Sequence, residues 1–294
     1  MSVSSTEPPG APRSEPPDLP PPVHADGVTT WRAVEYAAVP GYRPLLLDLH
    51  RPDGPLPALI VFLHGGGWRG GSRSGFGPAF ADWSPSPFLQ LAAHGFAVAS
   101  RDYRLSGEAR FPAPLEDVAA GLGWLRAQAE HLGIDPTRAA LWGESAGGHL
   151  AALLGLTDPG VRAVVDWYGP ADLTTVAADA AAGGISAVDP GAPDSREALL
   201  LGVAPSSDPE RARAASPVTH AHADAPPFLL LHGTADRLVP TRQSERLCAA
   251  LDDAGAAVTL ELFDGADHLW LGRPDVARAA FDRSVDFVLE RLTS

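Results

Sequence analysis

Lysine, cysteine and long hydrophobic runs are scarce or absent in this sequence, and each absence narrows what the chain can be. All 22 basic residues are arginine, a bias that indicates a GC-rich genome more than a chemical requirement. Cys248 is the single cysteine, so an intrachain disulfide and a thiolate metal cluster are both excluded. Against 36 acidic residues, the net charge is −14. Such a surface repels nucleic acid phosphates and anionic lipid, so we expect neither as a partner.

The hydrophobic runs that are present are all short. None is long enough to span a bilayer, which predicts that the chain does not insert into a membrane. The first segment, Met1 to Pro22, is rich in Ser, Pro and Glu and lacks the apolar centre of a signal peptide. We therefore expect a cytoplasmic protein. A chain that had already lost its signal peptide would look the same, so that alternative stays open.

Residues 1–24 are predicted to form a disordered, proline-rich tail, because Glu7 to Pro22 contains eight prolines and few apolar residues. One domain follows over residues 25–294, where apolar runs alternate with helical patterns. The middle runs are apolar throughout, as in parallel strands covered by helices on both faces. This alternation predicts an α/β fold with a mostly parallel, twisted, eight-stranded sheet, its first two strands forming an antiparallel hairpin at one edge. The expected strands are Trp31–Val39, Pro44–Leu49, Ala58–Leu63, Phe96–Ser100, Ala139–Trp142, Ala163–Tyr168, Pro227–Leu231 and Val258–Phe263.

Two intervals break this rhythm. Arg69 to Gln90 is rich in Gly, Ser, Pro and aromatic residues, and the second interval lies between the sixth and seventh strands. Residues 172–224 consist of Ala, Gly and Pro loops with a short helical pattern around Arg196–Gly202. Long insertions in compact domains are usually functional covers or mobile loops. We interpret residues 172–224 as a small cap over the functional site, with a plain surface excursion as the alternative. The other helices are expected near Leu115–His131, Ala146–Leu156, Ser244–Ala254 and Val276–Leu292.

The strongest local motif is Gly-x-Ser-x-Gly around Ser145, between an apolar strand and an apolar helix. A serine at such a tight turn is strained, and Gly143 and Gly147 remove side chains that would clash with it. The hydroxyl then stands beside the first free N–H groups of a helix, where an oxyanion is stabilised. Ser145 is therefore the candidate nucleophile; a mere helix cap is the alternative.

A second motif, His-Gly-Gly-Gly-Trp, follows the third expected strand. Its glycines allow backbone N–H groups to face a carbonyl oxygen, which is the arrangement of an oxyanion hole. We assign the N–H groups of Gly66, Gly67 and Ala146 to this hole. No phosphate-binding glycine motif follows, so a nucleotide site is disfavoured. His64 is interpreted as a structural residue that holds the glycine loop.

The acid and the base are expected at the ends of the last two strands. Asp236 follows the seventh strand and His268 follows the eighth, in the order Ser–Asp–His that this kind of sheet uses. Histidine is needed because serine is a poor nucleophile until its proton is removed. Asp236 would accept the other ring N–H and stabilise the imidazolium. Asp264 and Asp267 compete for the acid's role, but Asp267 directly precedes the histidine and should point away.

Together these motifs resemble the HGGG-type α/β-hydrolase esterases, which include hormone-sensitive-lipase-like enzymes and a feruloyl/acetyl-xylan esterase-like branch. The resemblance covers roughly residues 28–292 and includes Asp-Tyr-Arg-Leu at Asp102 and Tyr-Gly-Pro-Ala-Asp-Leu at Tyr168. It implies an α/β-hydrolase fold and a serine carboxylesterase that hydrolyses short-chain acyl or aromatic-acid esters through an acyl-enzyme. It implies no metal and no cofactor. The expected partner is a small-molecule ester.

Two other classes of function stay open at this point. Kynurenine formamidase is a similar enzyme, so an aryl formamide is an alternative substrate, and other amidase activity stays open with it. A catalytically silent α/β-hydrolase that only binds is the second, although such proteins usually lose a triad residue or a hole glycine.

Trp68 and Trp270 adjoin the glycine loop and the base, so we expect them to line the substrate site. A homodimer also stays possible, since this fold often uses its last strand and helix for dimers.

Overall fold

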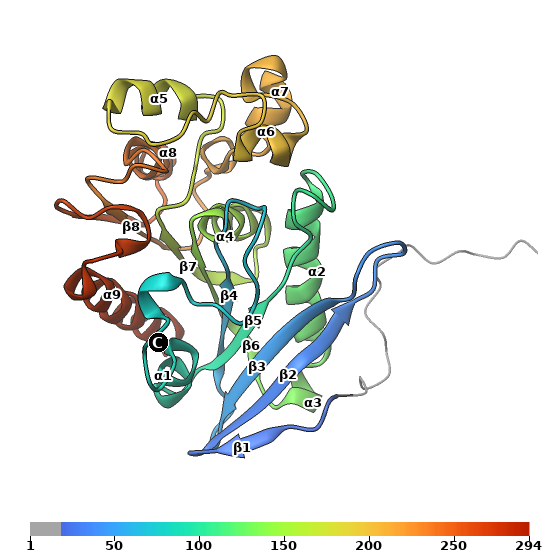
Figure 1. The fold of residues 1–294 in the computed structure, drawn as a ribbon. Coiled ribbons are helices and arrows are strands. Elements are labelled where there is room, and N and C mark those ends of the chain that lie inside the picture. Colours follow the sequence, from blue (N-terminus) through green and yellow to red (C-terminus); the bar gives the residue numbers. More distant parts are fainter. Residues whose placement is uncertain (1–18, 294) are drawn as a thin grey trace, which may run out of the picture.

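A nine-stranded sheet runs through the part of the chain that the computed structural model describes, residues 19–293 (Figure 1). The eight strands expected from the sequence are all present. The ninth, β1, is a three-residue edge strand with exposed side chains, held by antiparallel pairing to β2. The strands are β1 (Val23–Ala25), β2 (Val28–Ala37), β3 (Leu45–Pro52), β4 (Ala58–Leu63), β5 (Ala97–Arg101), β6 (Asp135–Glu144), β7 (Val161–Trp167), β8 (Phe228–Gly233) and β9 (Val258–Phe263).

The strand order is β1-β2-β3-β5-β4-β6-β7-β8-β9. From β5 to β9 all pairs are parallel, whereas β2, β3 and β5 pair antiparallel, which confirms the predicted hairpin. Every residue of β4 and of β8 is buried. Both strands are continuously apolar for most of their length because helices cover the sheet on each side.

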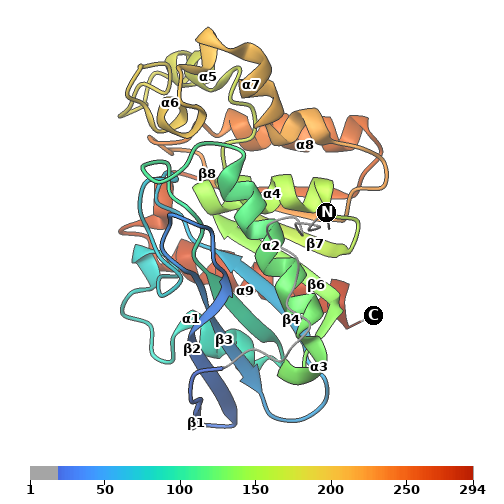
Figure 2. The ribbon, with the colours of Figure 1, turned by 90° about the vertical axis from the view of Figure 1, so that its right-hand side faces the viewer.

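Helices cover both faces of the sheet, as the alternating pattern predicts (Figures 1 and 2). On one face lie α2, α4 and α8, and on the other lie α1 and α9. The helices are α1 (Pro87–Ala93), α2 (Ala113–Ala127), α3 (Ala129–Leu132), α4 (Ala146–Thr157), α5 (Val176–Gly183), α6 (Arg196–Leu201), α7 (Pro209–Ala214), α8 (Arg242–Asp253) and α9 (Pro274–Leu292), with 3₁₀ turns η1 (Pro78–Phe80), η2 (Pro205–Ser207), η3 (Pro217–His220) and η4 (His268–Trp270).

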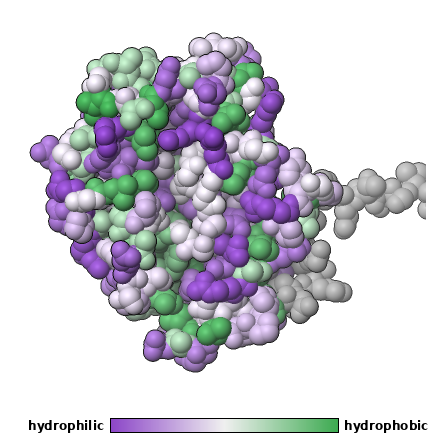
Figure 3. Space-filling view, viewed as in Figure 1, coloured by the Kyte–Doolittle hydropathy of each residue, from purple (hydrophilic) through white to green (hydrophobic). Residues whose placement is uncertain are grey.

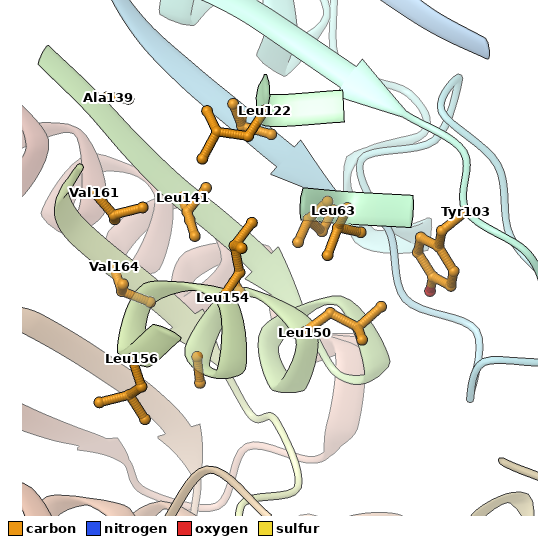
Figure 4. Packing of buried hydrophobic residues seen from close by; sticks show 14 of the residues in the cluster. Leu63, Tyr103, Leu122, Ala139, Leu141, Leu150, Leu154, Leu156, Val161 and Val164 are labelled. Atoms are coloured by element: carbon orange, nitrogen blue, oxygen red, sulfur yellow. The ribbon is translucent and has the colours of Figure 1, made fainter. Parts of the chain in front are cut away.

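Helix α4 is buried along almost its entire length, because only apolar and small residues follow Ser145. Figure 4 shows Leu150 and Leu154 of α4 pointing toward the sheet, near Leu63 and Leu141. Full burial of such a leucine contributes about 1.5–3 kcal/mol to folding. This packing fixes the start of α4 against the ends of β4 and β6, where the motifs lie.

The predicted tail over residues 1–24 needs a correction at its end. Residues 1–18 lie outside the described residues. Leu19 packs partly buried against the core, and β1 begins at Val23. The ordered domain therefore starts several residues before the predicted boundary, because pairing with β2 satisfies the backbone of a segment whose side chains give no strand signal.

The interval 172–224 contains α5, α6 and α7, which lie together at the top of the molecule in Figure 1. It is tied to the body by polar contacts. The N–H of Ala187 donates to the carbonyl of Arg237 at 2.8 Å, and Arg246 of α8 binds Asp179 of α5 through two bonds of 2.7 Å. The interval thus sits beside the loops that follow β8.

The surface is mixed in character. On the face shown in Figure 3, hydrophilic and hydrophobic residues are interspersed rather than gathered into one apolar area. Within residues 19–293, no helix combines the length and the apolar composition needed to cross a bilayer.

Candidate active site

Ser145 sits at a sharp turn between β6 and α4, with φ 52° and ψ −118°. Its N–H donates to the carbonyl of Trp167 on β7 at 2.7 Å, which fixes the turn to the sheet. A side-chain carbon at Gly143 would overlap the carbonyl of Gly147, and one at Gly147 would overlap the carbonyl of Leu63. The glycines are thus required by close backbone approach, and the strain holds the serine hydroxyl above the sheet.

The side chains of Ser145, His268 and Asp236 form one hydrogen-bonded chain. The distance from Oγ of Ser145 to Nε2 of His268 is 3.0 Å, and that from Nδ1 of His268 to Oδ2 of Asp236 is 2.6 Å. Ser145 follows β6, Asp236 follows β8 and His268 follows β9, and all three side chains are buried. The structure therefore brings together the three residues that the sequence singled out. With Nδ1–H donated to the carboxylate, Nε2 is free to accept the serine proton.

The carboxylate of Asp236 is held from several sides. Its Oδ1 accepts hydrogen bonds from the N–H groups of Leu238 and Val239, both at 2.8 Å. Its Oδ2 binds His268 and also His232, whose Nε2 lies 3.1 Å away. Burial by itself raises the pKa of Asp236, but the hydrogen bonds from His232 and His268 outweigh it and hold the pKa well below its ordinary value. The group is therefore ionised at neutral pH.

His232 was not singled out from the sequence, although it ends β8 in His-Gly-Thr-Ala-Asp. It is fully buried, and its Nε2 faces two acceptors, Asp236 and the carbonyl of Val239, each at 3.1 Å. Nε2 must therefore carry the proton, and Nδ1 accepts from the hydroxyl of Ser244 at 2.7 Å. The sequence pattern does not show this contact, because it depends on the turn after β8 that brings Asp236 back to the ring of His232.

The competing aspartates do not reach the imidazole of His268. Asp267 binds Arg237 through its side chain and accepts from the N–H of His268 at 2.7 Å, so it caps the η4 turn. Asp264 accepts from Thr234 at 3.2 Å. Both contacts agree with the choice of Asp236.

The glycine loop after β4 turns back tightly on itself. Gly66 and Gly67 have φ values of 115° and 61°, and the N–H of Arg69 donates to the carbonyl of Gly66 at 3.1 Å. Among the described residues, none accepts a hydrogen bond from the N–H of Gly66, Gly67 or Ala146. Free donors in a loop that packs on the serine turn are what an oxyanion hole requires.

Three side chains hold this loop from behind. The ring of His64 stacks on Tyr103 with centroids 4.4 Å apart, and the Tyr103 hydroxyl donates to the His64 carbonyl at 2.9 Å. Below the loop, Glu144 accepts from the N–H of Gly65 at 3.3 Å and from the hydroxyl of Tyr168 at 3.1 Å. Burial raises the pKa of Glu144, partly offset by these two donors. His64 thus pins the loop and lies outside the hydrogen-bonded chain of Ser145.

Known proteins resemble this chain in sequence and in fold. Residues 47–251 match the family model BD-FAE, which is more than half of the chain. The chain belongs to the BD-FAE family. Its sheet, helices and serine turn make it an α/β-hydrolase fold, with nine strands in the described residues.

Relatives and solved structures of this BD-FAE protein carry esterase names. It is similar to the esterases LipC and LipQ of Mycobacterium tuberculosis, at 34% and 32% identity over 82% and 74% of this chain. It spans 65% and 52% of those two relatives, about two thirds and about half of their length. A truncated carbohydrate esterase from gut microbiota superposes with a TM-score of 0.75 at 28% identity, covering 90% of this chain and 97% of that one. Propionate-bound esterase 2 of Thermogutta terrifontis gives 0.69 at 26% identity, covering 90% and 94%.

The expectation that Trp68 and Trp270 line the substrate site of this BD-FAE protein is wrong. Trp68 is 1% exposed and donates from its indole nitrogen to Nδ1 of His149 at 3.2 Å; Trp270 is 0% exposed and packs against Trp167 and Tyr168. Both have left-handed backbones, with φ values of 56° and 52°, which turn their side chains into the core.

Other aromatic residues lie beside the site. A cavity of about 620 Å³ adjoins the glycine loop and Leu269, the residue after His268. The interval Arg69 to Gln90 supplies most of its lining, and the sequence pattern assigns none of these residues to the site. Its lining includes Gly65, Gly66, Glu144 and Leu269 together with Phe76, Phe80, Trp83 and Phe88.

Across the described part of the chain, no three His, Cys, Asp or Glu side chains form a group that could hold a metal ion.

Proposed function

We propose that this protein is a serine carboxylesterase, with Ser145 as nucleophile, His268 as general base and Asp236 as the orienting acid. The observation that carries the proposal is the continuous chain from Ser145 Oγ through His268 to Asp236, at 3.0 and 2.6 Å, next to three free N–H groups. Serine, imidazole and carboxylate in this order perform acyl transfer on several unrelated folds.

The reaction follows from the geometry. Nε2 of His268 takes the hydroxyl proton as Ser145 Oγ attacks the ester carbonyl. The negative charge that develops on the carbonyl oxygen is stabilised by the N–H groups of Gly66, Gly67 and Ala146, each worth up to about 3–4 kcal/mol in the transition state. His268 then protonates the departing alcohol, which leaves an acyl group on Ser145. Water repeats the same steps and releases the acid.

The substrates we propose are esters of short acyl or aromatic acids. The cavity of about 620 Å³ beside Gly66 is lined mainly by aromatic and small side chains, which suits an apolar or aromatic group near the scissile carbonyl. The named relatives support the same class, since one solved neighbour binds propionate and another is a carbohydrate esterase.

The test combines hydrolysis with labelling. Purified protein is assayed on p-nitrophenyl esters of graded chain length, acetylated xylose and N-formylkynurenine, and a fluorophosphonate probe is mapped by mass spectrometry. We expect ester turnover and a label on Ser145, both lost in Ser145→Ala with the circular dichroism spectrum unchanged. Turnover that survives in this variant, or no label on Ser145, would refute the proposal. Faster hydrolysis of the formamide than of any ester would assign an amidase instead.

A further inference from the structure

Arg196 reaches from the insertion onto the glycine loop. It is the first residue of α6, and its aliphatic chain covers Gly67. A methyl group added at Gly67 would lie 2.5 Å from Cδ of Arg196 and 3.2 Å from its Nε. Gly67 supplies one of the proposed oxyanion donors. The guanidinium therefore lies within a side chain's length of the place where the ester carbonyl would bind.

The helix that carries Arg196 is firmly anchored. Ser195 caps it by accepting from the N–H of Ala198 at 3.0 Å, and Gly202 ends it in a left-handed conformation. Leu200 and Leu201 are fully buried, and the carbonyl of Leu200 accepts from the N–H of Phe111 at 2.8 Å. The position of Arg196 over the loop is thus set by the fold of the insertion.

Unlike Arg73 and Arg246, Arg196 has no carboxylate partner in residues 19–293. Arg73 binds Asp48 and Asp102, and Arg246 binds Asp179. Among the described residues, none forms an ion pair or a side-chain hydrogen bond with Arg196. Its buried neighbour Glu197 acts on it only through the electrostatic field.

We propose that Arg196 binds an anionic group of the substrate, so that the preferred esters carry a carboxylate close to the scissile carbonyl. This inference rests on the proposed esterase function and narrows its substrate class. A guanidinium presents several N–H donors in a planar fork that matches a carboxylate. In a chain of net charge −14, an unpaired arginine at this point also offsets the general repulsion of an anionic substrate.

The test compares charged and neutral esters of similar shape. For a charge on the acyl side, p-nitrophenyl hemisuccinate is compared with p-nitrophenyl pentanoate; for a charge on the alcohol side, 4-acetoxybenzoate is compared with p-tolyl acetate. The variants are Arg196→Gln and Arg196→Glu. Arg213→Gln, an exposed arginine on α7 in the same insertion, is the matched control. The neutral esters report whether each variant is folded and active.

We expect Arg196→Gln to lower kcat/KM for at least one anionic ester by about tenfold or more, and Arg196→Glu to lower it further. The neutral esters and the Arg213→Gln control should stay within about twofold. Added salt should raise KM for the anionic ester in the wild type but not in Arg196→Gln.

Three results would overturn the inference. If Arg196→Gln slows charged and neutral esters equally, Arg196 serves the oxyanion or the loop and not a substrate anion. If neutral esters are hydrolysed and no anionic ester responds to Arg196, the inference fails while the esterase stands. If no ester is hydrolysed and Ser145 takes no label, the proposed function fails and the inference falls with it.

Discussion

His232 donates a hydrogen bond of 3.1 Å to Oδ2 of Asp236, the same oxygen that binds the ring of His268 at 2.6 Å. Because His232 is fully buried and its Nε2 faces only acceptors, its role is to orient the carboxylate. Within residues 19–293, no hydrogen bond or ring contact joins it to Ser145 or to the glycine loop. We therefore regard it as a positioning residue that acts through Asp236 on His268, the proposed base.

Replacing this ring should slow turnover more than it weakens substrate binding. In His232→Leu, Asp236 loses one of its donors and can rotate, so His268 is less well aligned. A misplacement of this kind lowers kcat by up to about 10²-fold, while KM should change little. His232→Gln, whose amide N–H can replace the donor, should recover part of the rate. Steady-state kinetics on a p-nitrophenyl ester check this, and an unchanged kcat in His232→Leu would contradict it.

Rigidity of the glycine loop leads to a second prediction. Gly66 has φ 115°, and a side-chain carbon there would overlap the carbonyl of Gly70. Gly66→Ala should therefore displace the donor and lower kcat by about 10²-fold or more, with strain costing about 1–3 kcal/mol of stability. Gly107→Ala is the matched control, because nothing lies within 4 Å of its added carbon. Equal kinetics in the two variants would count against the oxyanion role of this loop.

The indole of Trp68 makes a third case. Its N–H donates to Nδ1 of His149, and Nε2 of His149 lies 2.7 Å from the carbonyl of Ala215, so the ring links the loop, α4 and the end of the insertion. Trp68→Phe leaves a buried acceptor unsatisfied, which costs about 1–3 kcal/mol, and should lower kcat by loosening the loop. Urea unfolding and ester kinetics measure both effects. Trp124→Phe, on α2, controls for the loss of an indole. If Trp68→Phe and Trp124→Phe have the same stability and the same kcat, the proposed link between the loop, α4 and the insertion is refuted.

The hydrogen-bonded chain of Ser145, His268 and Asp236 could be predicted because each member follows a strand with its own local signal. Parallel strands end at one edge of the sheet, so Ser145, Asp236 and His268 had to lie near one another. The tryptophans could not be placed, since adjacency to a functional residue says nothing about direction where the backbone is left-handed. Sequence analysis did not single out His232 or Arg196 for a related reason. Their contacts depend on a turn and on an insertion whose path the sequence pattern does not determine.

Asp166 on β7 leads to a prediction about stability and pH. Its carboxyl group is packed against Gly148 of α4 and accepts from the N–H of Gly169 at 2.9 Å. Burial raises the pKa of Asp166 from its ordinary 3.8 to about 7, opposed by the Gly169 donor and the field of His232. The folded protein therefore holds this proton more tightly than the unfolded chain does.

The sign follows from this difference in proton affinity. At a pH below the ordinary carboxyl pKa of 3.8, the contribution of Asp166 to the stability of the fold is fully present. This contribution is lost as the pH rises through about 7. The side chain that the variant Asp166→Asn introduces is neutral at every pH. When the pH is raised from about 5.5 to about 8.5, the Tm of this variant should therefore fall less than the Tm of the wild type. Asp286→Asn, exposed on α9, should keep the wild-type dependence. If Asp166→Asn and the wild type lose the same Tm over this range, the carboxyl group is already ionised in the fold at the lower pH, and burial by α4 does not control its proton.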